Sequence, residues 1–220
     1  MAYSLDWSVI PANMDIFIEG VLLTLEISFY ALLLSLPIGI LFGLGRISKN
    51  KIIYTISSIY VEVMRGVPLL VLLLWIFFVL GQFLNLGSYF SAVLGLAMFS
   101  GAFVAEIVRS GIQSVPKGQM EAARSSGMSY VQAMRFIILP QAFRRVLPPL
   151  ASQFIILIKD SSLVSTVAVI DLTLNAKNLV ATTFRHLEIW TFVALLYLVM
   201  TFSLSLLVRY LEKRLKVSEI

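Results

Sequence analysis

The sequence predicts an all-α integral membrane protein that crosses the bilayer with five helices. The chain has 220 residues, of which 59% are hydrophobic and only 13% are charged, whereas a soluble domain typically carries about 25% charged residues. Its mean hydropathy is +0.93. A span needs about 20 apolar residues, so the chain has room for about five spans with their loops. We therefore expect one transmembrane domain over residues 1–220.

Five apolar runs, separated by more polar segments, mark the expected spans. Gly39 and Gly43 lie in the first run, and small residues at this spacing let two helices pack closely. The segment 109–140 forms a long polar loop. The segment 161–188 is too short and too polar for two further spans, and we interpret it as a partly inserted hairpin of short helices on the outer side. The expected spans are approximately 17–45, 52–84, 88–108, 141–158 and 189–211.

The lysines and arginines predict the orientation of these spans. Most of the 17 basic residues lie in three places: after the first span, between the third and fourth spans, and after the fifth. Loops that are rich in Lys and Arg stay on the cytoplasmic side. We therefore expect the N-terminus outside and the C-terminus in the cytoplasm. The residues concerned are Arg46, Lys49, Lys51, Arg109, Lys117, Arg124, Arg135, Arg144, Arg145, Arg209, Lys213, Arg214 and Lys216.

Several classes of function are excluded by what the sequence lacks. There are no cysteines, so disulfides and thiolate metal sites are absent, and the single histidine, His186, cannot form a paired-histidine zinc site. No G-x-x-x-x-G-K-[ST] phosphate loop occurs, so any ATP that drives the protein binds to a separate subunit. We expect no catalytic residue, cofactor or metal in this chain. The net charge of +5 follows from the loop arginines and lysines, so we expect no nucleic-acid partner.

The second and fourth expected spans contain polar interruptions. The sequence EVMRGVP at 62–68 interrupts the second span, and the fourth holds Pro148-Pro149 before it reaches Lys159-Asp160-Ser161-Ser162. Each span up to its interruption has about 13 residues, which rise about 20 Å in a helix, short of the hydrocarbon core of about 30 Å. We therefore expect both interruptions inside the membrane. A charge at a lipid-facing helix centre costs about 2.5–3.5 kcal/mol, so these groups should face each other, water or a substrate.

These interruptions predict a substrate site near the bilayer midplane. Unwound backbone at that depth lines a cavity or is buried in protein, and its N–H and C=O groups can serve as ligands. An α-amino acid carries one carboxylate and one ammonium group. We expect Ser161, Ser162 and the backbone at Gly66 to donate to the carboxylate. Asp160 and Glu62 would accept from the ammonium group or from a cationic side chain.

The same charged residues also fit a purely structural interpretation. Arg65 and Lys159 would either pair with the acids while the site is empty or neutralise them permanently as neighbours along the chain. The residues alone leave both interpretations open. The neighbouring pairs are Glu62 with Arg65, Lys159 with Asp160 and, near the inner surface, Glu106 with Arg109.

A polar, basic segment, EIVRSGIQSVPKGQMEAARSSGMSYVQAMRFIILP, occupies residues 106–140 between apolar runs. It lies outside the lipid and is therefore available to a partner. Glu121, Ala122 and Ala123 suit a short helix that presents a small, flat face. Gly127 provides a place where the backbone can turn without a side chain.

The spacing in this segment resembles the EAA loop of the permease subunits of ATP-binding-cassette (ABC) importers. Residues 105–165 as a whole resemble the permeases of polar amino acid importers, with AEIVRSGIQSVPKGQMEAA, ILPQAFRRVLPPLASQF and IKDSSL in order. Pro140, which lacks an N–H, suits the first turn of the helix that re-enters the membrane. The fixed positions of the loop pattern are filled by Glu121-Ala122-Ala123, Gly127, Ile137 and Leu139-Pro140.

This resemblance implies a type I ABC importer permease, multi-pass in a bacterial cytoplasmic membrane. Its 121–140 loop would dock as a coupling helix on ATP-binding cassette ATPase subunits, which bind ATP and Mg. The substrate would be arginine, histidine, lysine or glutamine, delivered by an extracytoplasmic solute-binding protein. Because five spans are too few to surround a pore, we expect a second permease, either an identical copy or a close paralogue. Nucleotide binding would drive alternating access around the midplane site.

Two other classes of protein remain open. An ion-gradient-driven secondary transporter or channel would use the intramembrane carboxylates as a relay and would work without an ATPase. A membrane scaffold would bind anionic lipid or a soluble partner through its basic loop. Neither class accounts for the spacing within 121–140. The basic residues that a scaffold would use are Arg124, Arg135, Arg144 and Arg145.

Overall fold

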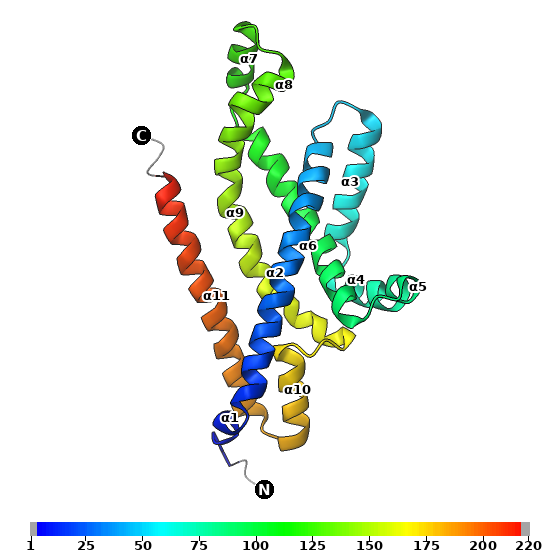
Figure 1. Ribbon diagram of the computed structural model, residues 1–220, viewed down its shortest axis with the longest axis vertical. Helices are drawn as coiled ribbons and strands as arrows, with labels where there is room; N and C mark the ends of the chain where they lie inside the picture. The colour runs from blue at the N-terminus through cyan, green and yellow to red at the C-terminus, as the bar shows by residue number, and fades with distance from the viewer. Residues whose placement is uncertain (1–3, 217–220) are drawn as a thin grey trace. The chain divides into compact units, whose positions relative to one another are not determined.

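The computed structural model describes residues 4–216, and within that range the chain forms helices and no strands (Figure 1). The long helices are α2 (Met14–Gly45), α3 (Lys51–Gly66), α6 (Ser88–Gln113), α9 (Leu139–Asp160) and α11 (His186–Lys216). The short helices are α1 (Val9–Ala12), α4 (Leu69–Trp75), α5 (Gly81–Leu84), α7 (Lys117–Ser125), α8 (Tyr130–Ala133) and α10 (Leu172–Thr183). Four helical stretches are long and apolar enough to cross a membrane, or five if the broken stretch from α3 to α5 is one span. The predicted all-α membrane class is confirmed.

The chain divides into two compact units, each built from segments that are distant in the sequence. Unit 1 comprises Met1–Leu33, Val67–Ala97 and Phe154–Leu206, and unit 2 comprises Leu34–Gly66, Met98–Gln153 and Leu207–Ile220. The helices α2, α6, α9 and α11 contribute residues to both units.

Unit 1 is organised around the packing of α10 against the N-terminal part of α2. A Cβ atom on Gly20 would lie 2.7 Å from the Cα atom of Leu172, so only glycine permits this approach. Two hydrogen bonds hold the contact: the Leu172 N–H donates to the Thr24 hydroxyl at 3.2 Å, and the Asn175 amide donates to the Ile16 carbonyl at 3.1 Å. The apolar core around it contains Val9, Ile10, Phe17, Leu172, Ala176, Leu179, Val180, Ile189 and Val193.

Unit 2 contains the close helix contact that the glycines of the first span predict. A Cβ atom on Gly43 would lie 2.7 Å from the Ala105 carbonyl oxygen, and one on Gly39 would clash with Val104. The predicted packing role of both glycines is therefore confirmed, because a side chain at either position would collide with α6. Val104, Val108 and Val146 are buried beside this contact.

The second predicted span is broken, but over a shorter stretch than expected. Helix α3 runs through Glu62 and Arg65 to Gly66, and α4 begins at Leu69. Pro68 precedes α4 with φ −59° and ψ 135°. A proline has no N–H and disfavours helical backbone in the residue before it, which explains why the break falls at Val67 and Pro68.

The fourth predicted span differs from the structure at its start. Helix α9 begins at Leu139, contains Pro148 and Pro149, and ends at Asp160 after 22 residues. At 1.5 Å per residue it is about 33 Å long, enough to cross the hydrocarbon core. The stretch from Arg145 to Lys159, on which the expectation of a short span rests, is unchanged by this earlier helix start, so the depth of Asp160 in the membrane stays a prediction.

Candidate functional site

Helix α7 is a short helix in unit 2 with a defined residue at each end. Figure 1 shows it beside α8, which leads into α9. Pro116 precedes it with φ −56° and ψ 135°. At its other end Gly127 has φ +85°, the Met128 N–H donates to the Ala123 carbonyl at 3.1 Å, and the Gly127 N–H donates to the Arg124 carbonyl at 3.1 Å. These two bonds form a Schellman motif, which requires a left-handed residue after the helix. The predicted turn at Gly127 is thus observed.

The exposed face of α7 is narrower than the sequence indicates. Glu121 and Ala122 are exposed, whereas Ala123 has a relative exposure of only 7%. Ala123 is therefore packed against the rest of the chain and does not belong to the surface that exposes Glu121 and Ala122. Its expected place on a flat alanine surface is wrong, and Glu121 with Ala122 forms the face that is open to a partner.

The inner face of α7 is fixed to the segment that leads into α9. Met120 packs against a small core of Val115, Ile138 and Ala142. Gln141 donates to the Gln119 side chain at 3.4 Å. This packing joins α7 to the start of α9.

The chain passes from α8 into α9 without a break. Ser129 caps α8 through a capping box, in which its hydroxyl accepts from the Gln132 N–H and the Gln132 side chain accepts from the Ser129 N–H. A π-helical turn, Met134–Ile138, then leads directly to Leu139. Pro140 is the second residue of α9, and the wider π turn before it accommodates a residue that has no N–H to donate.

Four charged side chains form a cluster in unit 2, whereas the sequence predicted only pairs of residues that are neighbours along the chain. Arg109 pairs with Glu106, which confirms one of those pairs. Arg46 bridges two helices, because it contacts Glu106 of α6 at 3.0 Å and Glu62 of α3 at 3.1 Å. Glu62 therefore pairs with Arg46, and the guanidinium of Arg65 lies 5.6 Å from the centre of the Phe103 ring. Sequence spacing did not identify Arg46, because its partners are brought to it only by the fold.

The other candidate substrate residues are consecutive in unit 1. Asp160 ends α9 and is half-buried, and no described residue forms an ion pair with it. Ser161 is buried and its hydroxyl donates to the Ile158 carbonyl at 2.8 Å, whereas the Ser162 carbonyl accepts from the Ser165 hydroxyl at 2.9 Å. The Ser161 hydroxyl proton is thus already used, which leaves its oxygen as an acceptor. Glu62, Arg65 and Gly66 form the last turn of α3 in unit 2.

Comparison with known proteins places these features in a family. Residues 35–217 match the family described as binding-protein-dependent transport system inner membrane component. The glutamine transport system permease protein GlnP of Escherichia coli (strain K12) is 40% identical over 215 residues, 96% of this chain and 98% of that protein. The probable glutamine ABC transporter permease protein GlnM of Bacillus subtilis (strain 168) is 42% identical over 212 residues, with the same shares covered.

Solved structures agree with the sequence relatives. One chain, from the crystal structure of an amino acid ABC transporter with histidines, is 40% identical and has a TM-score of 0.92, covering 96% of this chain and 100% of its own length. A chain of the inward-facing MetNI methionine ABC transporter has the same fold at 21% identity, with a TM-score of 0.78 over 93% of this chain and 98% of that one. The chain therefore belongs to the binding-protein-dependent transport system inner membrane components, as a multi-pass, non-enzymatic permease subunit of an amino acid ABC importer.

Proposed function

We propose that this permease imports polar amino acids by alternating access, driven through α7 by a separate ATPase subunit. The observation that carries the proposal is that one face of α7 is exposed while the opposite face is packed. Its Glu121–Ala122 face is exposed, and its opposite face is packed against the start of α9. A partner that grips the exposed face would move α7 and α9 together, and α9 carries Asp160 at its other end.

Glutamine is the first candidate substrate, and basic amino acids are the second. GlnP and GlnM are both named for glutamine, and the related crystal structure is of an amino acid ABC transporter with histidines. The half-buried carboxylate of Asp160 favours a cationic group, either the ammonium common to all amino acids or the side chain of arginine, lysine or histidine.

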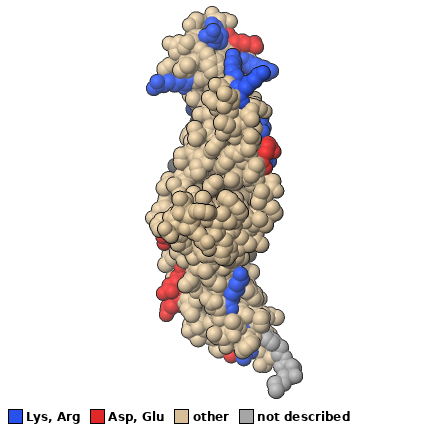
Figure 2. All heavy atoms as spheres, turned by 90° about the vertical axis from the view of Figure 1, so that its right-hand side faces the viewer, with Lys and Arg blue, Asp and Glu red and all other residues tan. Residues whose placement is uncertain are grey.

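The proposed assembly contains two permeases, the ATPase subunits and an outer solute-binding protein. The distribution of Lys and Arg supports an outer N-terminus and a cytoplasmic α7, and Figure 2 shows basic side chains gathered around α7 and α8. Up to five spans are too few to enclose a pathway alone, which supports a second permease, identical or closely related.

Uptake by proteoliposomes tests the proposal. Vesicles that contain the permease, its ATPase and its solute-binding protein should accumulate labelled glutamine only with ATP, and Glu121→Lys should abolish accumulation. Lys51→Glu is the control for charge reversal, because Lys51 is exposed at the start of α3, outside α7 and its packing against α9. Full uptake by Glu121→Lys would contradict the coupling role. Uptake by the permease alone under an ion gradient would instead identify a secondary transporter.

A further inference from the structure

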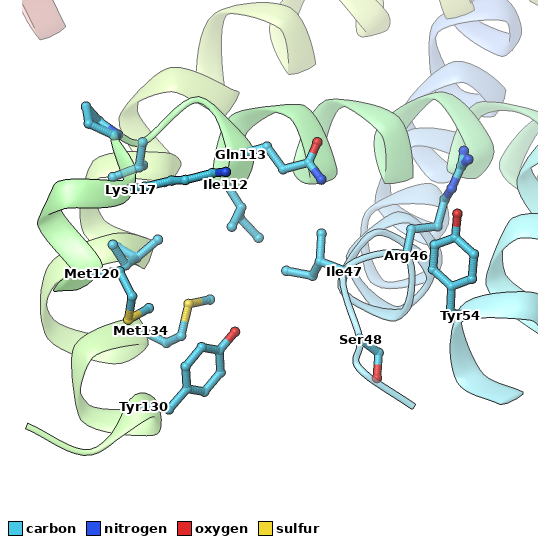
Figure 3. Close-up of a pocket in the computed structure, with 13 residues that line it drawn as sticks. Arg46, Ile47, Ser48, Tyr54, Ile112, Gln113, Lys117, Met120, Tyr130 and Met134 are labelled. Carbon is cyan, nitrogen blue, oxygen red and sulfur yellow. The ribbon is translucent and has the colours of Figure 1, made fainter. Parts of the chain in front are cut away.

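A cleft of about 600 Å³ lies in unit 2 beside α7, and the proposed transport function does not use it (Figure 3). It is lined by the loop after α2, the start of α3, the end of α6 and the segment from α7 to α8. In Figure 3, Ile47 points into the cleft from one side, and Met120, Met134 and Tyr130 face it from the other. Its walls are thus mainly apolar.

The polar groups of the cleft leave it with uncompensated positive charge. Arg46 and Lys117 line it, and none of its described lining residues is acidic. Arg46 is paired with two glutamates, whereas Lys117 forms no ion pair with any described residue. Lys49 adds a further cation, with its ammonium 5.9 Å from the centre of the Tyr130 ring. Such a cleft favours an anionic group.

A second, entirely different hollow adjoins this cleft. It is a groove of about 300 Å³ between α2, α6 and α9, and all its lining residues are apolar. Leu36, Ile40 and Leu44 line it at intervals of four residues, so it follows one face of α2 for about 12 Å. Ile112 lines both the cleft and the groove. The cationic cleft and the apolar groove are therefore neighbours that meet at Ile112.

The two hollows differ in their position along the helices. Helices α2 and α6, which are long and apolar enough to cross a membrane, end at Gly45 and Gln113. The cleft is lined mainly by residues at or beyond these ends, such as Arg46 and Gln113, whereas the groove extends back along the helices to Leu36 and Val104. We infer that the cleft lies near the lipid headgroups and that the deeper end of the groove lies beside the acyl chains.

We propose that these two hollows bind one anionic phospholipid. Its phosphate lies in the cleft near Lys117, and an acyl chain lies in the groove against Leu36, Ile40 and Leu44. Basic pockets between transmembrane helices are suited to anionic headgroups. A free phosphate would use the cleft but not the groove, and a protein side chain would not need an apolar channel that runs into the membrane. A lipid, with one anionic and one apolar part, would use both hollows.

Native mass spectrometry of the purified complex with its ATPase tests this proposal. The delipidated complex is titrated with dioleoyl phosphatidylglycerol, dioleoyl phosphatidylcholine or glycerol phosphate. We expect the phosphatidylglycerol to be retained in preference to the other two. Lys117→Gln should reduce the preference for phosphatidylglycerol over phosphatidylcholine about fivefold, the weight of one lysine beside an anionic membrane surface. Lys51→Gln is the matched control, because Lys51 is exposed nearby and does not line the cleft.

A second pair of variants tests the groove without changing charge. Leu44→Trp should fill the groove and lower phosphatidylglycerol retention, whereas Leu41→Trp, on the same helix but outside the groove, should not. Equal retention of both lipids, equal effects within either pair of variants, or binding of glycerol phosphate as tight as that of the lipid would overturn the proposal. So would lipid retention by the permease alone that disappears in the complex, since the ATPase would then occupy the cleft.

Discussion

Asp171 shows how a single buried side chain can make the stability of unit 1 depend on pH. It caps α10, where its Oδ1 accepts from the Leu174 N–H at 2.9 Å. Its side chain is fully buried, and its Oδ2 has no hydrogen-bond partner among the described residues. Burial raises the pKa of this carboxyl to about 6. No sequence pattern marked Asp171, because its burial depends on the packing of α10 against α2.

This raised pKa gives a prediction with a definite sign. The folded protein binds the proton more tightly than the unfolded chain, whose pKa is near 3.8, so the penalty of the buried charge is fully present above pH 6. Stability should rise as the pH falls from about 7 to about 4, by up to about 3 kcal/mol. Thermal unfolding in detergent at several pH values measures it. Asp171→Asn keeps the cap and should remove the rise, whereas exposed Asp15→Asn should keep it. An equal slope in Asp171→Asn and the wild type would refute this assignment.

Asp160 is the candidate substrate residue whose role in substrate recognition can be tested separately from any role in the fold. It is half-buried at the end of α9 and pairs with no described cation, including its neighbour Lys159. Asp160→Asn should therefore reduce uptake of arginine and histidine more than uptake of glutamine, by about tenfold for a lost charge-assisted hydrogen bond. Competition uptake in proteoliposomes measures the ratio. Equal loss for all substrates, or no loss, would remove Asp160 from recognition.

At the scale of elements, local patterns predicted where helices exist better than where they begin and end. The break before α4 was predicted because proline is a local signal, but Glu62 and Arg65 were wrongly assigned to the interruption. Pro148 and Pro149 lie inside α9 without ending it. Proline costs a helix interior about 3 kcal/mol, yet α9 continues, because buried residues such as Val146, Leu157 and Ile158 hold it in place. Tertiary packing of this kind has no local signature.

The charge cluster predicts which of the two ion pairs of Arg46 contributes more to stability. Glu106 joins α6 to Arg46, which is 14% exposed, whereas Glu62 of α3 is 66% exposed. Glu106→Gln should cost about 2 kcal/mol, because it leaves Arg46 and Arg109 poorly paired in a partly buried place. Glu62→Gln should cost less than about 1 kcal/mol, as exposed ion pairs do. Unfolding by SDS titration compares the two, and equal losses would contradict the bridging role of Glu106.

For the molecule as a whole, composition and one motif predicted the protein class and the family, which the periodicity of apolar residues did not. The share of apolar residues alone identified a membrane protein, and the spacing from Glu121 to Pro140 identified the importer family that the comparisons confirm. The division into two units could not be read from the sequence, because each unit joins segments that lie far apart along the chain. The same holds for the cleft beside α7, whose walls come from four separate segments.

Cysteine crosslinking tests most directly the central claim that an ATPase subunit grips the exposed face of α7. The chain contains no cysteine, so Ala122→Cys introduces a unique thiol on that face, and Ala123→Cys introduces a buried one beside it. Each variant is combined with single cysteines on the ATPase surface, with and without ATP. We expect a nucleotide-dependent crosslink from position 122 and little or none from position 123. A thiol at position 122 that never reaches the ATPase, or that reacts only with reagents added outside the cell, would contradict it.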